Sequence, residues 1–69
     1  MSNLPERMRE LRAEKRKTQR ELAEFLGMKL RGYQCYEMGE TEPSLDKLFR
    51  LADYYQVSLD YLTGRTEQR

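Results

Sequence analysis

Basic and amide side chains gather in the N-terminal half of this 69-residue chain, where they have the chemistry to bind a polyanion. Residues 1–36 carry nine Lys or Arg against five Glu, a net charge of +4, whereas residues 37–69 carry four basic against seven acidic residues, a net charge of −3. The overall net charge of +1 hides this asymmetry. A molecule polarised in this way presents one end to nucleic-acid phosphates and keeps the other end away.

Catalytic and metal-binding side chains are scarce in the same sequence. It contains no histidine and a single cysteine, Cys35, so it cannot form an internal disulfide, a Cys/His zinc site or an imidazole acid–base pair. Glu40 and Glu42 read as an acidic connector without a pocket around them. We therefore expect no enzyme, no metal and no cofactor.

Membrane and export signals are also missing from the sequence. No apolar run approaches the roughly 20 residues that span a bilayer, and the polar start Met-Ser-Asn-Leu-Pro is not a secretory signal. We expect a cytoplasmic protein associated with the nucleoid and no membrane partner.

The basic half contains the most specific pattern, the segment TQRELAEFLGMKLRGYQCYEMG from Thr18 to Gly39. Its spacing predicts two short helices joined by a tight turn, with Gly27 in the left-handed conformation that the turn needs. Thr18 and Glu21 form a capping box, so the first of these helices begins there and ends near Leu26. The residues expected to pack inside the unit are Leu22, Ala23, Leu26, Met28, Tyr33 and Tyr36. This pattern predicts a DNA-reading helix-turn-helix.

The second helix of the unit should run from about residue 29 to Met38, with Gly39 as its left-handed cap. Tyr33 and Tyr36 share one face, and the opposite face carries Leu30, Arg31, Gln34 and Cys35. Gly32 lies inside the helix at a cost of about 1 kcal/mol relative to Ala. Either the close approach of another backbone or room for Tyr33 would explain that glycine.

Three further helices complete the expected all-α fold, a compact five-helix bundle. The first spans about residues 4–15, and most of its charges, Arg7 and Arg9 among them, read as a solvated and mutually paired surface. A later helix begins after Ser44 and carries core residues at helical spacing, namely Leu45, Leu48, Leu51, Ala52 and Tyr55. The last helix is short and ends at Gly64.

The length of the chain indicates one domain, near the lower limit at which an apolar core offsets chain entropy. We place this domain at residues 1–64, with the helix-turn-helix unit at about 18–38. Residues 65–69 are expected to be a frayed tail.

The motifs TQRELAEFLGM, YEMGETEPSLDKL and LADYYQVSLDYLTG closely resemble the phage-repressor-like, or xenobiotic-response-element-like, helix-turn-helix family of bacterial and phage regulators. The resemblance covers about residues 6–64. It implies a lambda-repressor-like domain that binds operator DNA as a two-fold dimer and regulates transcription, most often as a repressor.

By position, the resemblance implies two sets of DNA contacts. Phosphate contacts would come from Gln19, at the positive end of its helix, and from its neighbours Thr18, Arg16 and Lys17. The residues that would face the bases in the major groove are Lys29, Leu30, Arg31, Gln34 and Cys35. Arg31 suits guanine and Gln34 suits adenine, each through two hydrogen bonds, whereas Leu30 suits a thymine methyl and Lys29 a phosphate or guanine.

The resemblance also assigns structural roles. Arg12 and Glu37 correspond to an ion pair that ties the first helix to the end of the third in some relatives, although a solvated charge is the alternative for Arg12. Tyr33 is larger than the usual residue at its place, so the recognition helix would be displaced or leave the tyrosine hydroxyl near solvent. For Cys35, a small tolerated side chain is favoured over a redox switch.

A dimer contact is expected around the last helix, at Val57, Leu59 and Tyr61. Tyr61 is the preferred interface residue, whereas core closure is the preferred interpretation of Leu59. Two recognition helices would then enter successive major grooves roughly 34 Å apart. The alternative function keeps the fold as a protein-interaction module, such as the antitoxin of a toxin–antitoxin pair, with Phe25, Tyr54 and Tyr61 as contacts. The expected partners are therefore double-stranded DNA and a second copy of the chain, with a further protein partner left open.

Overall fold

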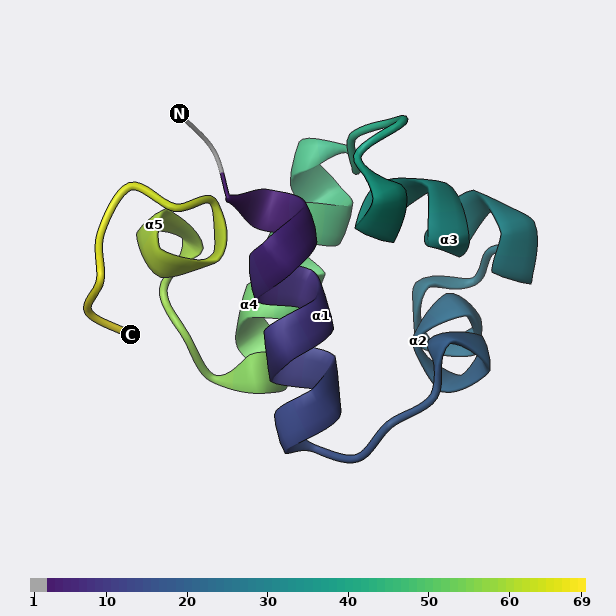
Figure 1. Ribbon diagram of the computed structural model, residues 1–69, viewed down its shortest axis with the longest axis horizontal. Coiled ribbons are helices and arrows are strands. Elements are labelled where there is room, and N and C mark those ends of the chain that lie inside the picture. The colour runs from purple at the N-terminus through teal and green to yellow at the C-terminus, as the bar shows by residue number, and fades with distance from the viewer. Residues whose placement is uncertain (1–2) are drawn as a thin grey trace.

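The computed structural model describes residues 3–69 of the protein, so residues 1 and 2 of the expected domain lie outside the described residues. Its described residues form α1 (Leu4–Glu14), α2 (Gln19–Leu26), α3 (Leu30–Met38), α4 (Leu45–Tyr55) and α5 (Leu59–Leu62). The predicted all-α fold with five helices is confirmed. In Figure 1, α1 crosses in front of α4, α2 and α3 lie together on one side, and α5 lies on the other. Among the helices of residues 3–69, none has the length and apolar character needed to cross a bilayer.

Side chains at the helix ends explain why the helices begin and end where they do. The Thr18 hydroxyl accepts a hydrogen bond from the Glu21 backbone at 3.0 Å, and the Glu21 carboxylate accepts one from the Thr18 backbone at 2.8 Å. Gly27 and Gly39 adopt left-handed conformations, with φ of 69° and 76°, and end α2 and α3. A serine hydroxyl caps each of α4 and α5. Because a cap of this kind contributes about 1 kcal/mol, local sequence sets these boundaries.

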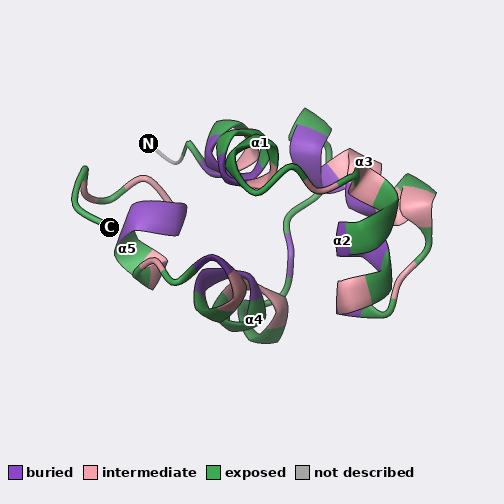
Figure 2. Cartoon of the chain, turned by 90° about the horizontal axis from the view of Figure 1, so that it is seen from below, coloured by how far each residue is buried: buried purple, intermediate pink, exposed green. Residues whose placement is uncertain are grey.

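One hydrophobic core joins the five helices, whose buried faces turn toward one another in Figure 2. α2 packs against α3, α1 packs against both α3 and α5, and α4 packs against α5. The buried apolar residues are Leu4, Met8, Leu11, Leu22, Ala23, Leu26, Tyr33, Tyr36, Leu51, Ala52, Tyr55, Tyr61 and Leu62. The helix-turn-helix unit formed by α2 and α3 is therefore held on the rest of the domain through α1, and α2 also contacts α4.

The first turn of α4 departs from the predicted core. Leu45 is 60% exposed, and Phe49, one turn later, is 50% exposed. The stripe that α4 buries is centred on Leu51 and Tyr55, and successive residues turn by about 100°, so Leu45 and Phe49 lie at and beyond its edge. The prediction that Leu45 belongs to the core was wrong for this reason.

The last five residues make contacts that differ from the expected frayed tail. Arg69 donates two hydrogen bonds to the carboxylate of Glu14 in α1, and the Arg69 carbonyl accepts one from the Ser58 backbone at 2.8 Å. Arg7, assigned above to a solvated surface, is buried and donates to the Tyr61 carbonyl at 2.6 Å and to a tail carbonyl at 3.3 Å. The contacts of Arg7, and those between Arg69 and Glu14, join residues more than 50 positions apart in the sequence, which is why local patterns did not indicate them.

Candidate nucleic-acid interface

α3 presents two different faces. Tyr33 and Tyr36 are buried on the inner one, as their spacing predicted. On the other face, Lys29 and Arg31 are exposed and the remaining residues are half-buried. We call this outer set the reading face; its residues are Lys29, Leu30, Arg31, Gln34 and Cys35.

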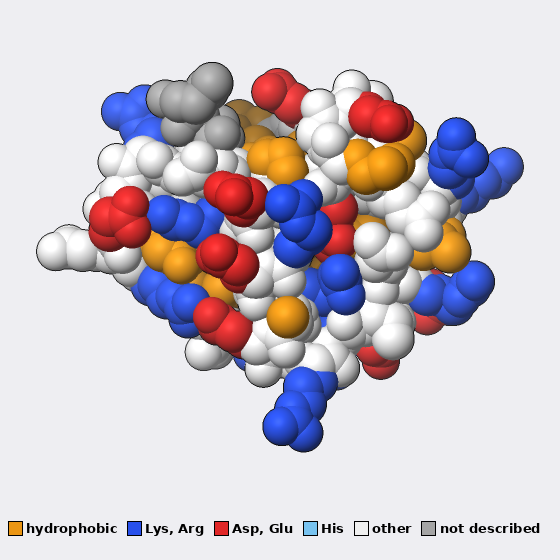
Figure 3. Space-filling view, viewed as in Figure 1, with side chains coloured by type: hydrophobic (Ala, Val, Ile, Leu, Met, Phe, Trp, Pro, Cys, Tyr) orange, Lys and Arg blue, Asp and Glu red, His pale blue; other side chains and the backbone are white. Residues whose placement is uncertain are grey.

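A second accessible group, Arg16–Gln19, lies in the loop before α2 and in its first residue, and we call it the anchor segment. Arg16 and Thr18 are exposed, and Lys17 and Gln19 are half-buried. Arg16 has a φ of 56°, so the chain turns there in a left-handed conformation without a glycine. Figure 3 shows Lys and Arg side chains projecting at this loop and over α2 and α3, whereas acidic side chains lie in a row over α1. Backbone N–H groups at the start of α2 add a partial positive charge to the anchor segment.

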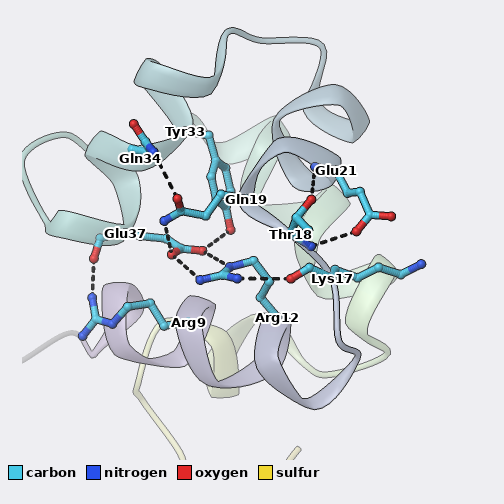
Figure 4. A network of polar contacts seen from close by, with 9 residues as sticks. All are labelled: Arg9, Arg12, Lys17, Thr18, Gln19, Glu21, Tyr33, Gln34 and Glu37. Carbon is cyan, nitrogen blue, oxygen red and sulfur yellow. Dashed lines mark hydrogen bonds and ion pairs between the residues drawn. The ribbon is translucent and has the colours of Figure 1, made fainter.

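A buried hydrogen-bond network centred on Glu37 underlies both groups, as Figure 4 shows. Glu37 is only 2% exposed. Its Oε2 accepts from Arg12 Nε at 2.7 Å and from the Tyr33 hydroxyl at 2.6 Å, and its Oε1 accepts from Arg12 Nη2 and Gln19 Nε2, both at 3.0 Å. The two oxygens thereby use the roughly four acceptor positions of a carboxylate. The Arg12–Glu37 pair that the resemblance implied is present and ties α1 to the end of α3.

The hydrogen-bond partners of Glu37 stabilise the ionised form of its carboxylate. Burial works to raise the pKa of Glu37, but hydrogen bonds from Arg12, Tyr33 and Gln19 outweigh it, so this pKa lies below its ordinary value. Burial and the bond to Glu37 raise the pKa of Tyr33. At neutral pH the carboxylate is therefore ionised and only accepts, while the tyrosine hydroxyl stays protonated and donates.

Gln19 connects this network to the reading face. Its Nε2 donates to Glu37, and its Oε1 accepts a hydrogen bond from Gln34 Nε2 at 3.1 Å. The resemblance implied separate roles for Gln19 at a phosphate and Gln34 at a base. The structure brings the two amides into contact, which joins the anchor segment to the reading face.

Comparison with known proteins identifies the family. The sequence model of the protein family described as Helix-turn-helix matches residues 8–62 of the chain. The chain belongs to the helix-turn-helix family. A solved structure agrees: the crystal structure of a transcriptional regulator from Listeria innocua superposes with a TM-score of 0.91 at 32% identity, covering 100% of this chain and 64% of that one.

Two curated relatives of this helix-turn-helix domain carry descriptive names. The chain is 42% identical over 62 residues to the uncharacterized HTH-type transcriptional regulator YobD of Bacillus subtilis, covering 90% of this chain and 55% of that protein. It is 37% identical over 62 residues to the cryptic phage CTXphi transcriptional repressor RstR of Vibrio cholerae, with the same coverage of each. The chain thus spans about half the length of these relatives. Their names describe a transcriptional regulator and a transcriptional repressor.

Tyr33 fits the helix-turn-helix core in a way that the sequence did not predict. Its ring is fully buried, and its hydroxyl bonds to Glu37 one turn later, so the hydroxyl is neither near solvent nor unsatisfied. A Cβ at Gly32 would lie 3.0 Å from the terminal methyl of Met28. The close neighbour of this glycine is therefore the Met28 side chain, which would have to shift to admit a Cβ there.

Arg9 and Phe25 have structural roles that residue type alone did not indicate. Arg9, read as a solvated charge, donates to the Glu37 carbonyl near the end of α3, where a cation also complements the helix dipole. The Phe25 ring packs at 4.6 Å, between centroids, on Tyr54 of α4. It is thus engaged in helix packing and is not the free aromatic of the protein-interaction alternative.

The residues expected at a dimer contact differ in accessibility. Val57 and Leu59 are half-buried, whereas Tyr61 is 8% exposed. The guanidinium groups of Arg7 and Arg69 lie 3.8 and 5.2 Å from the centre of the Tyr61 ring. The preferred interface residue is therefore covered by cations of its own chain, because α5 turns this ring toward α1 and the tail.

Proposed function

We propose that this helix-turn-helix domain binds double-stranded DNA sequence-specifically and regulates transcription, as a repressor dimer on an imperfect palindrome. The observation that carries the proposal is the division of α3 into a buried tyrosine face and an accessible reading face beside a basic anchor segment. The major groove, about 12 Å wide, admits a helix presented in this way. The names of the relatives support the regulatory role. Such a protein would act in the cytoplasm, at the nucleoid.

The anchor segment would hold phosphates without reading sequence. Arg16 and Lys17 supply charge, and the first backbone amides of α2 supply directed donors. Thr18 uses its oxygen to cap α2 and keeps its hydroxyl hydrogen for a phosphate. Gln19 keeps one N–H beyond the bond to Glu37.

The reading face would discriminate bases. Exposed Arg31 would pair with guanine through two acceptors, and half-buried Gln34 would bond adenine. Leu30 would contact a thymine methyl, Lys29 a phosphate or guanine, and Cys35 would occupy the groove as a small side chain. We retain Val57 and Leu59 as the two-fold contact, which would place half-sites about 34 Å apart.

A protein-interaction module, such as an antitoxin, is the second candidate function. The observation that favours it is the pair Leu45 and Phe49, two large apolar side chains exposed on α4. If this function is the correct one, replacing Leu45 or Phe49 by alanine would weaken binding of the partner protein and leave DNA binding unchanged.

Selection of genomic fragments bound by the 69-residue chain at physiological salt, followed by sequencing, tests the proposal. We expect an enriched imperfect palindrome, with an affinity whose logarithm falls linearly with the logarithm of salt concentration. Failure to enrich any sequence would overturn the DNA-reading function.

The reading face and the anchor segment should respond differently to substitution. Arg31→Ala should relax preference at one base pair, at a cost of about 1–3 kcal/mol on the preferred sequence. Arg16→Ala should weaken preferred and random DNA alike and reduce the salt slope by about 1. Binding titrations on both DNAs measure this, and equal losses for the two variants on both would contradict the assignment.

A further inference from the structure

We infer that Glu37 determines which atoms Gln34 presents to DNA, by fixing the orientation of the Gln19 side-chain amide between them. The inference rests on the proposed DNA-binding function and deepens it. It makes two residues that need not touch a base, Glu37 and Gln19, into positioning residues for base preference.

The first step is at Glu37. Its carboxylate is buried, paired with Arg12 and ionised, so it offers acceptors and no donor. The nitrogen and oxygen ends of a glutamine amide have nearly the same shape, and only their hydrogen bonds distinguish them. Because the group at 3.0 Å from Glu37 Oε1 must donate, it is the nitrogen of Gln19. The Gln19 oxygen is thereby turned toward Gln34.

The second step transfers this polarity to the reading face. The Gln19 oxygen only accepts, so the group at 3.1 Å from it must be the nitrogen of Gln34. This leaves the Gln34 oxygen and one N–H for a ligand. Figure 4 shows the Gln34 amide at the outer end of this chain of bonds, with its oxygen pointing away from Gln19.

The third step concerns the base. The outward oxygen accepts from the amino group of adenine or cytosine, whereas the major-groove oxygens of guanine and thymine would face it as acceptors. Adenine also offers an acceptor to the remaining N–H. A free glutamine can rotate its amide to present either its oxygen or its nitrogen to a base. The hydrogen bonds from Glu37 through Gln19 to Gln34, which we call the relay, remove one of these two orientations. We expect about 10-fold or greater preference for adenine, followed by cytosine, over guanine and thymine at this position.

The test compares base preferences of the 69-residue chain and its variants by selection from randomised duplexes. Gln34→Ala identifies the base pair that Gln34 reads. Gln19→Lys should reverse the preference there toward guanine and thymine, because an ammonium group donates to both Glu37 and the Gln34 oxygen and turns the Gln34 nitrogen outward. Gln19→Ala should flatten the preference at this base pair. Glu24→Gln is the matched control, since it raises the net charge by one, as Gln19→Lys does, at an exposed residue of α2 that is not part of the relay.

Preferences at the other base pairs should not change, and thermal melting followed by circular dichroism should show that each variant is folded. The relay is overturned if Gln34→Ala alters no base pair, or if it alters one whose preference Gln19→Lys leaves unchanged. If the wild type selects no sequence, the proposed function fails, and the relay is decided without DNA. In that case Gln19→Ala must shift the side-chain amide resonances of Gln34 in an NMR spectrum, and no shift overturns the relay.

Discussion

Two arginines of α1 anchor two junctions in different ways. Arg12 meets the buried carboxylate of Glu37 with two hydrogen bonds, where α1, α2 and α3 come together. Arg7 lies among backbone carbonyls and the ring of Tyr61, where α1, α5 and the tail come together, and its charged partner Glu67 is exposed. At the Glu37 junction a buried carboxylate is therefore paired with the half-buried Arg12, whereas Arg7 at the tail junction is held mainly by neutral acceptors. The first also reaches the reading face, and the second does not.

The largest effect is expected from Arg12→Ala. It leaves the Glu37 carboxylate buried without its cation, which costs about 3–5 kcal/mol in the free energy of unfolding. Urea unfolding measures this loss. Arg12→Lys is the matched control and should lose less, because it keeps the charge but not the two-pronged geometry. An Arg12→Ala variant as stable as the wild type would remove the distinction between the junctions.

Arg7→Ala should have a smaller effect. It removes a charged donor from the Tyr61 carbonyl and the cation over the Tyr61 ring, a loss of about 1.5–3 kcal/mol. DNA selection with this variant, at a temperature where it is folded, should return the wild-type sequence preference. A changed preference would mean that the tail junction also reaches the reading face.

The sequence predicted local features well and contacts between distant segments poorly. Elements set by neighbouring residues were predicted well: the Thr18–Glu21 capping box, the glycine caps and the two faces of α3 each depend on residues within four positions. Contacts between distant segments were not, because nothing near Arg7 in the sequence marks Tyr61 as its acceptor. The Arg12–Glu37 pair was available only through family resemblance. The Gln19–Gln34 bond was missed although both residues had been singled out, since it requires the relative placement of α2 and α3.

Acid should weaken the Glu37 junction. The pKa of Glu37 is lower folded than unfolded, so its contribution is present above the unfolded pKa of about 4.3 and is lost as pH falls through the folded value. Stability of the wild type should therefore fall below about pH 4. Glu37→Gln should lower stability at neutral pH and reduce this acid dependence. Urea unfolding from pH 7 down to pH 3 measures both, and an unchanged slope in the variant would show that other carboxylates dominate.

Arg69→Ala should have the smallest effect of the series. The Arg69–Glu14 pair is half exposed on both sides, so solvent screens it, although the hydrogen bond from Arg69 still lowers the pKa of Glu14. We expect a change in melting temperature close to experimental error, and none at 1 M salt, where the Debye length is about 3 Å. Glu14→Gln is the matched control. A large loss of stability in Arg69→Ala that persists at high salt would mean that the stacking of Arg69 on Tyr61, and not its charge, stabilises the tail junction. Arg7 and Arg69 would then both be structural residues of the tail junction, as Arg12 is of the Glu37 junction.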